Sequence, residues 1–433
     1  MSLLPLFEKY YSPNTSCLLE SVSRHEKTGR YSIIAAHPEF IFRSWGKTIQ
    51  INNRPAFSGN PLDELKKIFE SRKIKYDPSF PPFTGGAVGY IGYDSVRLWE
   101  TIGDRAEKDI NIPDIYLLFY DNVIVFDHFG NKIYKFGANK KSGYRFSEEE
   151  YVAGKMHPSM SKEVFCEMVL KAKEYIAAGD IYQVNLSQRI SMDIECDGWQ
   201  MYKRLRQINP SPFAGFMDLD GIQIIGCSPE RLVKVTGNII ETRPIAGTFP
   251  RGKNEEEDRE LSEQLVLHPK ERAEHIMLVD LERNDLGRVS RYGSVKVDEM
   301  MTVESYSHVH HIVSNVTGIV EKGIDQIDIL KAVFPGGTIT GCPKIRCIQI
   351  IEELEPVRRN LYTGCMGWIG YNGNMDLNII IRTIVKIGGK IYIQTGAGIV
   401  ADSIPEREYN ETLYKARAMV EAVMGQQQTD LKC

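Results

Sequence analysis

The chain has 433 residues, which exceeds the usual length of one domain, so we expect one large elaborated domain or two fused lobes. Hydrophobic residues make up 42% and charged residues 25%, as in a globular protein with a sizeable core. The 53 Lys and Arg residues against 57 Asp and Glu residues give a net charge of −4, which excludes the basic surplus typical of nucleic-acid binding. These values favour an enzyme that acts on a small molecule.

No targeting or membrane segment is indicated. The N-terminus has no basic run followed by an apolar stretch, and no uninterrupted run of roughly 18 apolar residues could span a membrane. The eight cysteines are scattered and contain no CxxC pair. The sequence therefore predicts a reduced, cytoplasmic protein without membrane or nucleic-acid partners.

Taken in chain order, the first third predicts strands separated by turns, together with one helix. The strands are expected at 31–36, 41–45, 86–91 and 122–126, and the helix at 61–70. A polar stretch at 137–160 is then expected to be a connector.

The remainder mixes helical and strand patterns. Ser161 is a plausible cap for a helix that runs to Ala178. Further strands are expected at 222–225, 232–235, 379–387 and 390–394, and further helices at 255–267, 270–281, 342–353 and 405–424. Because the two patterns do not alternate strictly, they favour an α+β or layered α/β fold over a doubly wound sheet.

Two pairs of glutamates stand three residues apart within predicted helices. Glu271 and Glu274 would face one direction, and so would Glu408 and Glu411. Two such pairs could build an oxygen site for Mg²⁺, which prefers a few carboxylates, several waters and an anionic substrate. The alternative is that each pair is a solvated helix face, which spacing alone favours.

Glycine-rich turns are a second candidate for chemistry. They lie at 244–248, 334–341 and 394–398, and Gly396 and Gly398 are suited to hold a carboxylate because their backbone can approach an anion closely. Any one of them could also be a simple turn. No GxGxxG or GxxxxGK[ST] fingerprint is present.

His311 and Glu230 are candidate acid–base residues. His311 could instead be a hydrogen-bonded strand residue, and Glu230 could form a surface ion pair with Arg231. A zinc site at His308, His310 and His311 is disfavoured because no further His or Cys stands at ligand spacing.

The order of the motifs along the chain decides between these alternatives. It runs through GDIYQVNLSQR from 179, SPER from 228, PIAGT from 244, KERAEH from 270, LVDLERNDLGRV from 278, FPGGTITGCPK from 334, GAGIVADS from 396 and ETLYKARA from 411. This succession resembles the chorismate-utilising enzymes, which include the anthranilate, aminodeoxychorismate, isochorismate and salicylate synthases. The resemblance covers nearly all of 160–425, and PPFTGGAVGYIGYD from 81 extends it into the first third.

The resemblance implies an α+β fold, a layered α/β/β/α sandwich made of two intertwined lobes. It divides the chain into an N-terminal region at 1–145 and a chorismate-binding catalytic region at 160–425. It also implies Mg²⁺ held by Glu274 and Glu411, with Glu271 and Glu408 in support.

The other roles implied by the resemblance belong to the substrate pocket. Glu230 matches the general acid that protonates the leaving 4-hydroxyl group. Chorismate's carboxylates would be held by Arg382, Lys415 and the backbone of Gly396, Ala397 and Gly398. Thr248 and His311 would line the same pocket.

Gln183 separates the branches of this family. Members that add water carry a Lys base there, whereas members that add an amine carry Gln, so ammonia is the expected nucleophile. Because the chain has no glutaminase-like residue set, a separate glutamine amidotransferase subunit is expected to supply it.

The product remains open between two amines. FPGGTITG, the sequence after Pro210 and MDLNI from 375 resemble aminodeoxychorismate synthases, which exchange the C4 hydroxyl for an amine and are the favoured branch. Ala246 stands where many of them carry a nucleophilic Lys, so ammonia would have to attack directly. The alternative is anthranilate synthase, which aminates C2 and eliminates pyruvate.

Overall fold

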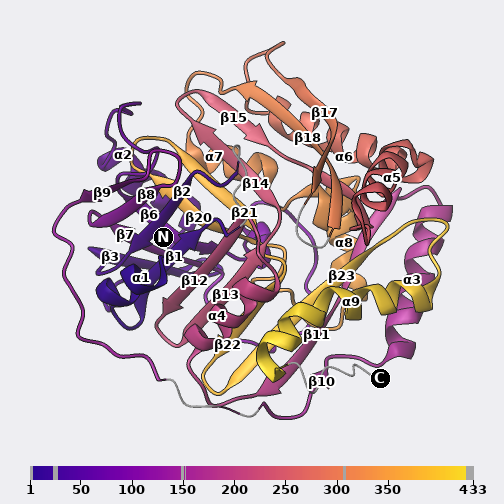
Figure 1. Ribbon diagram of the computed structural model, residues 1–433, viewed down its shortest axis with the longest axis horizontal. Helices are drawn as coiled ribbons and strands as arrows, with labels where there is room; N and C mark the ends of the chain where they lie inside the picture. Colours follow the sequence, from indigo (N-terminus) through magenta and orange to yellow (C-terminus); the bar gives the residue numbers. More distant parts are fainter. Residues whose placement is uncertain (1–2, 23–27, 148–150, 152, 306–308, 426–433) are drawn as a thin grey trace.

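The structure is a computed structural model that describes residues 3–22, 28–147, 151, 153–305 and 309–425. In these ranges the chain folds into two large antiparallel sheets with helices on their outer faces (Figure 1). None of the described helices combines the length and the apolar character that a membrane crossing requires.

The first sheet, which we call sheet A, contains eleven strands within the described ranges. Their order is β10-β11-β23-β22-β13-β12-β1-β2-β8-β9, and β19 pairs with β11. The strands are β1 (Thr15–Glu20), β2 (Tyr31–Ala35), β8 (Val123–Asp127), β9 (Lys132–Phe136), β10 (His157–Pro158), β11 (Gln183–Asp193), β12 (Phe213–Leu219), β13 (Ile222–Ser228), β19 (Gly341–Cys342), β22 (Thr383–Ile387) and β23 (Lys390–Ile399).

The second sheet, sheet B, contains twelve strands in the same ranges. Their order is β16-β18-β15-β14-β21-β20-β6-β7-β3-β4-β5, and β17 pairs with β18. The strands are β3 (Phe40–Trp45), β4 (Thr48–Ile51), β5 (Phe57–Ser58), β6 (Gly86–Ile91), β7 (Ile115–Tyr120), β14 (Arg231–Thr236), β15 (Ile239–Thr242), β16 (Ile245–Pro250), β17 (Lys296–Ser305), β18 (Val309–Ile319), β20 (Cys365–Gly370) and β21 (Met375–Ile379). Both sheets therefore combine strands from early and late parts of the chain.

The helices begin where the sequence supplies a cap or a first-turn proline. Ser161 caps α3 by accepting a hydrogen bond from the Val164 amide at 3.4 Å, and α2, α6 and α9 carry a proline in the first turn. The helices are α1 (Leu4–Tyr10), α2 (Pro61–Ser71), α3 (Lys162–Ala177), α4 (Gly198–Ile208), α5 (Glu255–Leu267), α6 (Pro269–Gly287), α7 (Gln326–Val333), α8 (Lys344–Leu354) and α9 (Pro405–Met424), with short 3₁₀ turns η1 (Tyr93–Leu98) and η2 (Gly337–Ile339).

Three apolar clusters define the layers. One lies between the sheets and joins side chains such as Ile33 and Met217 of sheet A to Val88 and Met366 of sheet B. A second packs α1, α4 and α9 on sheet A, and the third packs α2, α6, α7 and α8 with sheet B and the neighbouring part of β11. The predicted α+β sandwich with α/β/β/α layers is confirmed.

The predicted strands and helices are confirmed within a few residues, with one correction. The segment at 379–387 is not one strand: β21 ends at Ile379 in sheet B, and β22 begins at Thr383 in sheet A. Arg382 between them has a φ of 51°, a left-handed conformation that breaks an extended strand. The chain uses this break to cross from one sheet to the other.

Candidate functional site

Two helices bring the two glutamate pairs to one end of the sandwich. Glu271 and Glu274 lie in the first two turns of α6, which packs on β16 and β18. Glu408 and Glu411 lie in the first two turns of α9, which packs on β23. Figure 1 shows both helices on the side of the molecule where β11 and β18 also lie.

The four carboxylates influence one another. Burial raises the pKa of Glu274, and the negative charges of Glu271 and Glu411 raise it further. Burial also raises the pKa of Glu408, with a contribution from Glu411. Glu274 and Glu408 are therefore partly buried next to other carboxylates, which the side chains of a fully solvated helix face would not be.

The carboxylates do not form a complete metal cage by themselves. Among the described residues, no group of three or more His, Cys, Asp and Glu side chains is close enough to hold an ion. Glu411 is exposed and bonds Lys415, with 2.7 Å between Oε1 and Nζ. A cation here would need further oxygen ligands from water and from a bound anion.

Strands β11 and β23 form the floor beside these helices. Gln183 is the first residue of β11, is 6% exposed, and donates from Nε2 to Oε1 of Glu274 at 3.3 Å. A Cβ atom at Gly398 would come within 2.5 Å of Gln183 Nε2, and one at Gly396 within 2.4 Å of Asn185 Oδ1. Only glycine leaves room for these amides, while Ala397 between them is fully buried.

Two cations face the glycine strand. Lys415 donates to the Gly396 carbonyl at 3.0 Å as well as bonding Glu411. Arg382 donates to the Lys415 carbonyl at 3.3 Å, and burial lowers the pKa of its guanidinium group. In the part of the chain that the structure describes, Arg382 forms no ion pair with a carboxylate. A buried guanidinium without a counter-ion is suited to bind a carboxylate of a substrate.

Glu230 lies between β13 and β14 and is only 7% exposed. Burial raises the pKa of its carboxyl to about 7, although the Thr338 hydroxyl and the charge of Lys415 lower it in part. The alternative of a surface ion pair with Arg231 is wrong: Arg231 bonds Asp376 at 2.9 Å and Glu241 at 3.3 Å instead. Glu230 can therefore carry a proton near neutral pH, as a general acid requires.

Most of the PIAGT segment lies in strand β16, which forms one side of the candidate site. Gly247, with a φ of 76°, makes a bulge in the pairing with β18, so that Ala246 lies opposite Ile312 and Thr248 opposite His311. The Thr248 side chain lies outside the described part of the structure. Burial lowers the pKa of His311 to about 4, so its ring is neutral at physiological pH. His311 lies in strand β18, which agrees with the alternative that it is a hydrogen-bonded strand residue. The nearby positive charge of Arg382 lowers the pKa of its ring further.

The other two histidines of the segment at 308–311 give no support to a zinc site. His308 lies outside the described residues, and His310 bonds the Ser305 hydroxyl at 2.8 Å and Asp258 at 2.9 Å.

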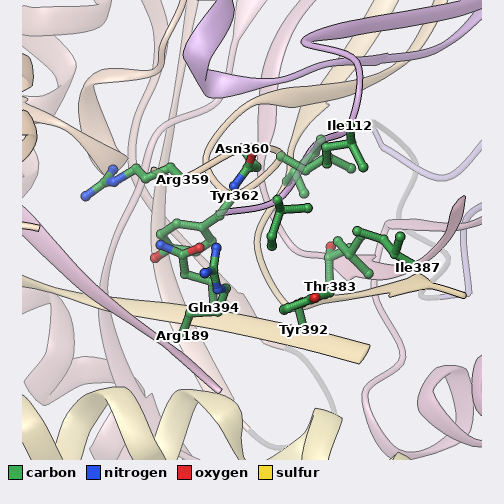
Figure 2. A pocket seen from close by; sticks show the side chains of 13 residues that line it. Ile112, Arg189, Arg359, Asn360, Tyr362, Thr383, Ile387, Tyr392 and Gln394 are labelled. Atoms are coloured by element: carbon green, nitrogen blue, oxygen red, sulfur yellow. The ribbon is translucent and has the colours of Figure 1, made fainter. Parts of the chain in front are cut away.

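A small cavity of about 30 Å³ lies between the sheets, next to this site. Figure 2 shows Tyr362, Gln394 and Arg189 gathered at one end of it. None of the predicted site residues lines it, although Tyr362 also reaches the candidate site, where its hydroxyl would be 2.8 Å from a Cβ at Gly396. A larger hollow of about 790 Å³, next to α2 and α7, contains none of the predicted site residues either.

Sequence reasoning missed Tyr362 and Asn185. Tyr362 is buried, and burial raises the pKa of its hydroxyl, although the positive charges of Arg359 and Arg382 lower it in part. Asn185 lies two residues after Gln183, so strand alternation places both side chains on one face, which is a signal that could have found it.

Comparison with known proteins agrees with this geometry. Residues 17–421 match the family described as chorismate binding enzyme. The chain is 44% identical to aminodeoxychorismate synthase component 1 of Bacillus subtilis, over 100% of this chain and 97% of the relative. It is 41% identical to anthranilate synthase component 1 of Acetivibrio thermocellus, over 97% and 92%. The crystal structure of anthranilate synthase component I from Streptococcus pneumoniae superposes with a TM-score of 0.81, at 37% identity over 92% of this chain and 93% of that one.

The chain therefore belongs to the chorismate binding enzyme family and is a chorismate-utilising enzyme. The relatives carry two different names at nearly equal identity, so the comparisons leave the product open between them.

Proposed function

We propose that this protein aminates chorismate to 4-amino-4-deoxychorismate, with Mg²⁺ as cofactor and ammonia from a glutamine amidotransferase partner. The observation that carries this proposal is the buried, protonatable Glu230 near the charge of Lys415, whose backbone carbonyl accepts a hydrogen bond from the second cation, Arg382. Chorismate is a dicarboxylate with a hydroxyl leaving group, so it needs both kinds of residue.

Each side chain has a part in this reaction. Arg382, Lys415 and the backbone at 396–398 bind the carboxylates, while the neutral His311 and the β16 segment close the pocket. Glu230 donates its proton to the C4 hydroxyl group, which leaves as water. The lone pair of ammonia forms the new C–N bond, and Glu230 takes one proton back from that nitrogen. The net change exchanges NH₃ for H₂O, so no oxidant or reductant is required.

The glutamates fit a magnesium site. Glu274 and Glu408 carry raised pKa values because negative charge accumulates where burial already disfavours it, and a divalent cation would relieve this repulsion. Glu274 and Glu411 would bind the ion, with Glu271 and Glu408 in support, and water and a substrate carboxylate would complete its ligands. Bound there, Mg²⁺ would stabilise negative charge that develops as the hydroxyl leaves.

Gln183 supports ammonia as the nucleophile. Its amide cannot remove a proton from water, whereas ammonia has a free lone pair at alkaline pH and needs no base. The relatives are named component 1, which fits a second component, and we propose that this partner is the amidotransferase. A cytoplasmic location would suit the reduced cysteines.

Anthranilate synthase is the second candidate. The observation in its favour is Ala246, which is buried and offers no nucleophile at the position where many aminodeoxychorismate synthases have Lys. The names of similar proteins also include anthranilate synthase component 1.

Product analysis separates the two. The purified chain is incubated with chorismate, Mg²⁺ and ammonium at alkaline pH, and aminodeoxychorismate lyase is added to one half. We expect para-aminobenzoate only in the half with lyase. Fluorescent anthranilate without lyase would assign the chain to the second candidate, and unchanged chorismate in both halves would contradict the proposed function altogether.

A further inference from the structure

Two amide oxygens on the floor of the candidate site have no hydrogen-bond donor among the residues that the structure describes. They are Oε1 of Gln183 and Oδ1 of Asn185, and both atoms are buried. Their residues are 6% and 8% exposed. Buried acceptors are almost always satisfied in folded proteins, so two on one short segment call for an explanation.

Both amides lie on the same face of β11. Residues two apart along a strand point to one side, and Asn185 pairs with Gly398 across the ladder. The Asn185 Oδ1 atom lies over Gly396, and the Gln183 amide lies over Gly398. The hydrogen bond from Gln183 Nε2 to Glu274 fixes the orientation of that amide and leaves Oε1 as the free acceptor.

The nucleophile matches this pair of acceptors. Ammonia has three N–H donors and one lone pair, and the lone pair must point at the carbon that it attacks. Two amide oxygens can accept two of the N–H groups without engaging the lone pair. A carboxylate or another anion would be repelled by the same oxygens.

We propose that Asn185, together with Gln183, forms the subsite that binds ammonia before it attacks. This inference rests on the proposed function, because it assumes that ammonia is the nucleophile. It adds Asn185 as a nucleophile-binding residue, separate from the groups that hold chorismate and the metal.

The chain supplies a matched control on the same strand. Gln188 is 1% exposed, and its Oε1 also has no partner. It lies on the opposite face of β11, where its Nε2 donates to the Thr412 hydroxyl at 2.6 Å. Removing the Gln188 amide therefore perturbs the same strand from the face opposite Gln183 and Asn185.

The test measures the Michaelis constants for ammonia and for chorismate at one fixed pH, with ammonium salts as the nitrogen source. We expect Asn185→Leu to raise KM for ammonia about tenfold, as for the loss of one hydrogen bond, and to change KM for chorismate less than twofold. Asn185→Asp keeps the acceptor oxygens and should restore KM for ammonia to within about threefold of the wild type. Gln188→Leu should leave both constants unchanged.

Several results would overturn the inference. They are an unchanged KM for ammonia in Asn185→Leu, an equal rise in Gln188→Leu, or a rise confined to KM for chorismate. If Asn185→Leu does not fold, as judged by circular dichroism, Asn185→Ser is measured instead, with the same expected rise because its hydroxyl is too short to reach. A wild-type chain that consumes no chorismate would instead contradict the proposed function, so the two failures are distinguishable.

Discussion

Glu20 and Glu230 are both buried glutamates, yet their surroundings differ in kind. Glu20 in β1 is 6% exposed and accepts hydrogen bonds from Tyr202 at 2.7 Å and from Arg206 at 2.8 Å. Glu230 is 7% exposed, and among the described residues it forms no ion pair; the nearest arginine in sequence bonds other carboxylates. The first is bonded by a hydroxyl and a guanidinium group, whereas burial raises the pKa of the second to about 7.

This contrast extends to the regions around the two residues. Beside Glu20, α1 and α4 pack on β12 through tilted and edge-to-face rings, including Phe7, Trp199 and Phe216. The Glu230 carboxyl instead lies near the charge of Lys415, which bonds Glu411 and the Gly396 carbonyl. The first region is held together by its own residues, whereas we propose that the second binds chorismate, ammonia and Mg²⁺. Buried atoms without a partner among the described residues also lie elsewhere, for example Ser44 Oγ in β3, so it is the raised pKa of the Glu230 carboxyl that sets this region apart.

The largest expected effect follows from removing a proposed metal ligand. Glu274→Gln or Glu411→Gln should abolish chorismate turnover, because a neutral amide cannot replace a carboxylate on Mg²⁺. The rate of chorismate turnover is measured at the Mg²⁺ concentration used for the wild-type protein. The control is Glu263→Gln on α5, where the Glu263 side chain is 68% exposed. Wild-type rates in either variant would remove the metal site from the proposal.

The contrast between Glu20 and Glu230 is tested by making the same substitution, Glu to Gln, at both positions. Glu230→Gln should lower kcat by about 10²–10⁴-fold, because the amide has no acidic proton, while leaving the fold intact. Glu20→Gln should lower the free energy of unfolding by about 2 kcal/mol, because it leaves Arg206 partly buried without its counter-ion, and should keep kcat. Steady-state kinetics and urea unfolding of both variants give the four values. A large loss of kcat in Glu20→Gln would show that the two regions are not separate.

Arg382 tests whether a buried unpaired cation binds the substrate. Arg382→Asn should raise KM for chorismate about 100-fold, as for the loss of a charged hydrogen bond. Asn tolerates a positive φ, so the crossing between the sheets should survive. Kinetics at saturating ammonia measure the effect. Unchanged KM in a folded variant would mean that Arg382 serves only the fold.

The last prediction is a pH dependence, whose size grows with the distance from the pKa of Glu230. The pKa of Glu230 is raised to about 7, so the residue is protonated below that pH and loses its proton above it. Expressed per concentration of unprotonated ammonia, kcat/KM should be level below about pH 7 and fall roughly tenfold for each pH unit above it. A profile that remains level to pH 9 would exclude Glu230 as the acid. In Glu20→Gln the same profile should be unchanged.

Much of the fold was available from the sequence by itself. The α5 helix was predicted at its observed bounds, and the Ser161 cap was predicted for α3, because caps and apolar periodicity act over a few residues. The candidate site residues were found through a succession of motifs, and the glutamate pairs through helical spacing. These signals depend on residues that are close together in the chain, so they can be read from the sequence alone.

Only the tertiary structure shows the sheet to which each strand belongs and the polar groups that are buried. The apolar run at 379–387 looked like one strand, but its two halves join different sheets, and only the backbone at Arg382 shows the crossing. The protonation of Glu230 depends on burial between β13 and β14, and the free oxygens of Gln183 and Asn185 depend on glycines more than 200 residues later in the chain. Solvent exclusion and missing partners are properties of atoms brought together in space. The sequence by itself therefore determined which residues and elements are present, and the packing of two sheets determined which of those residues are left to react.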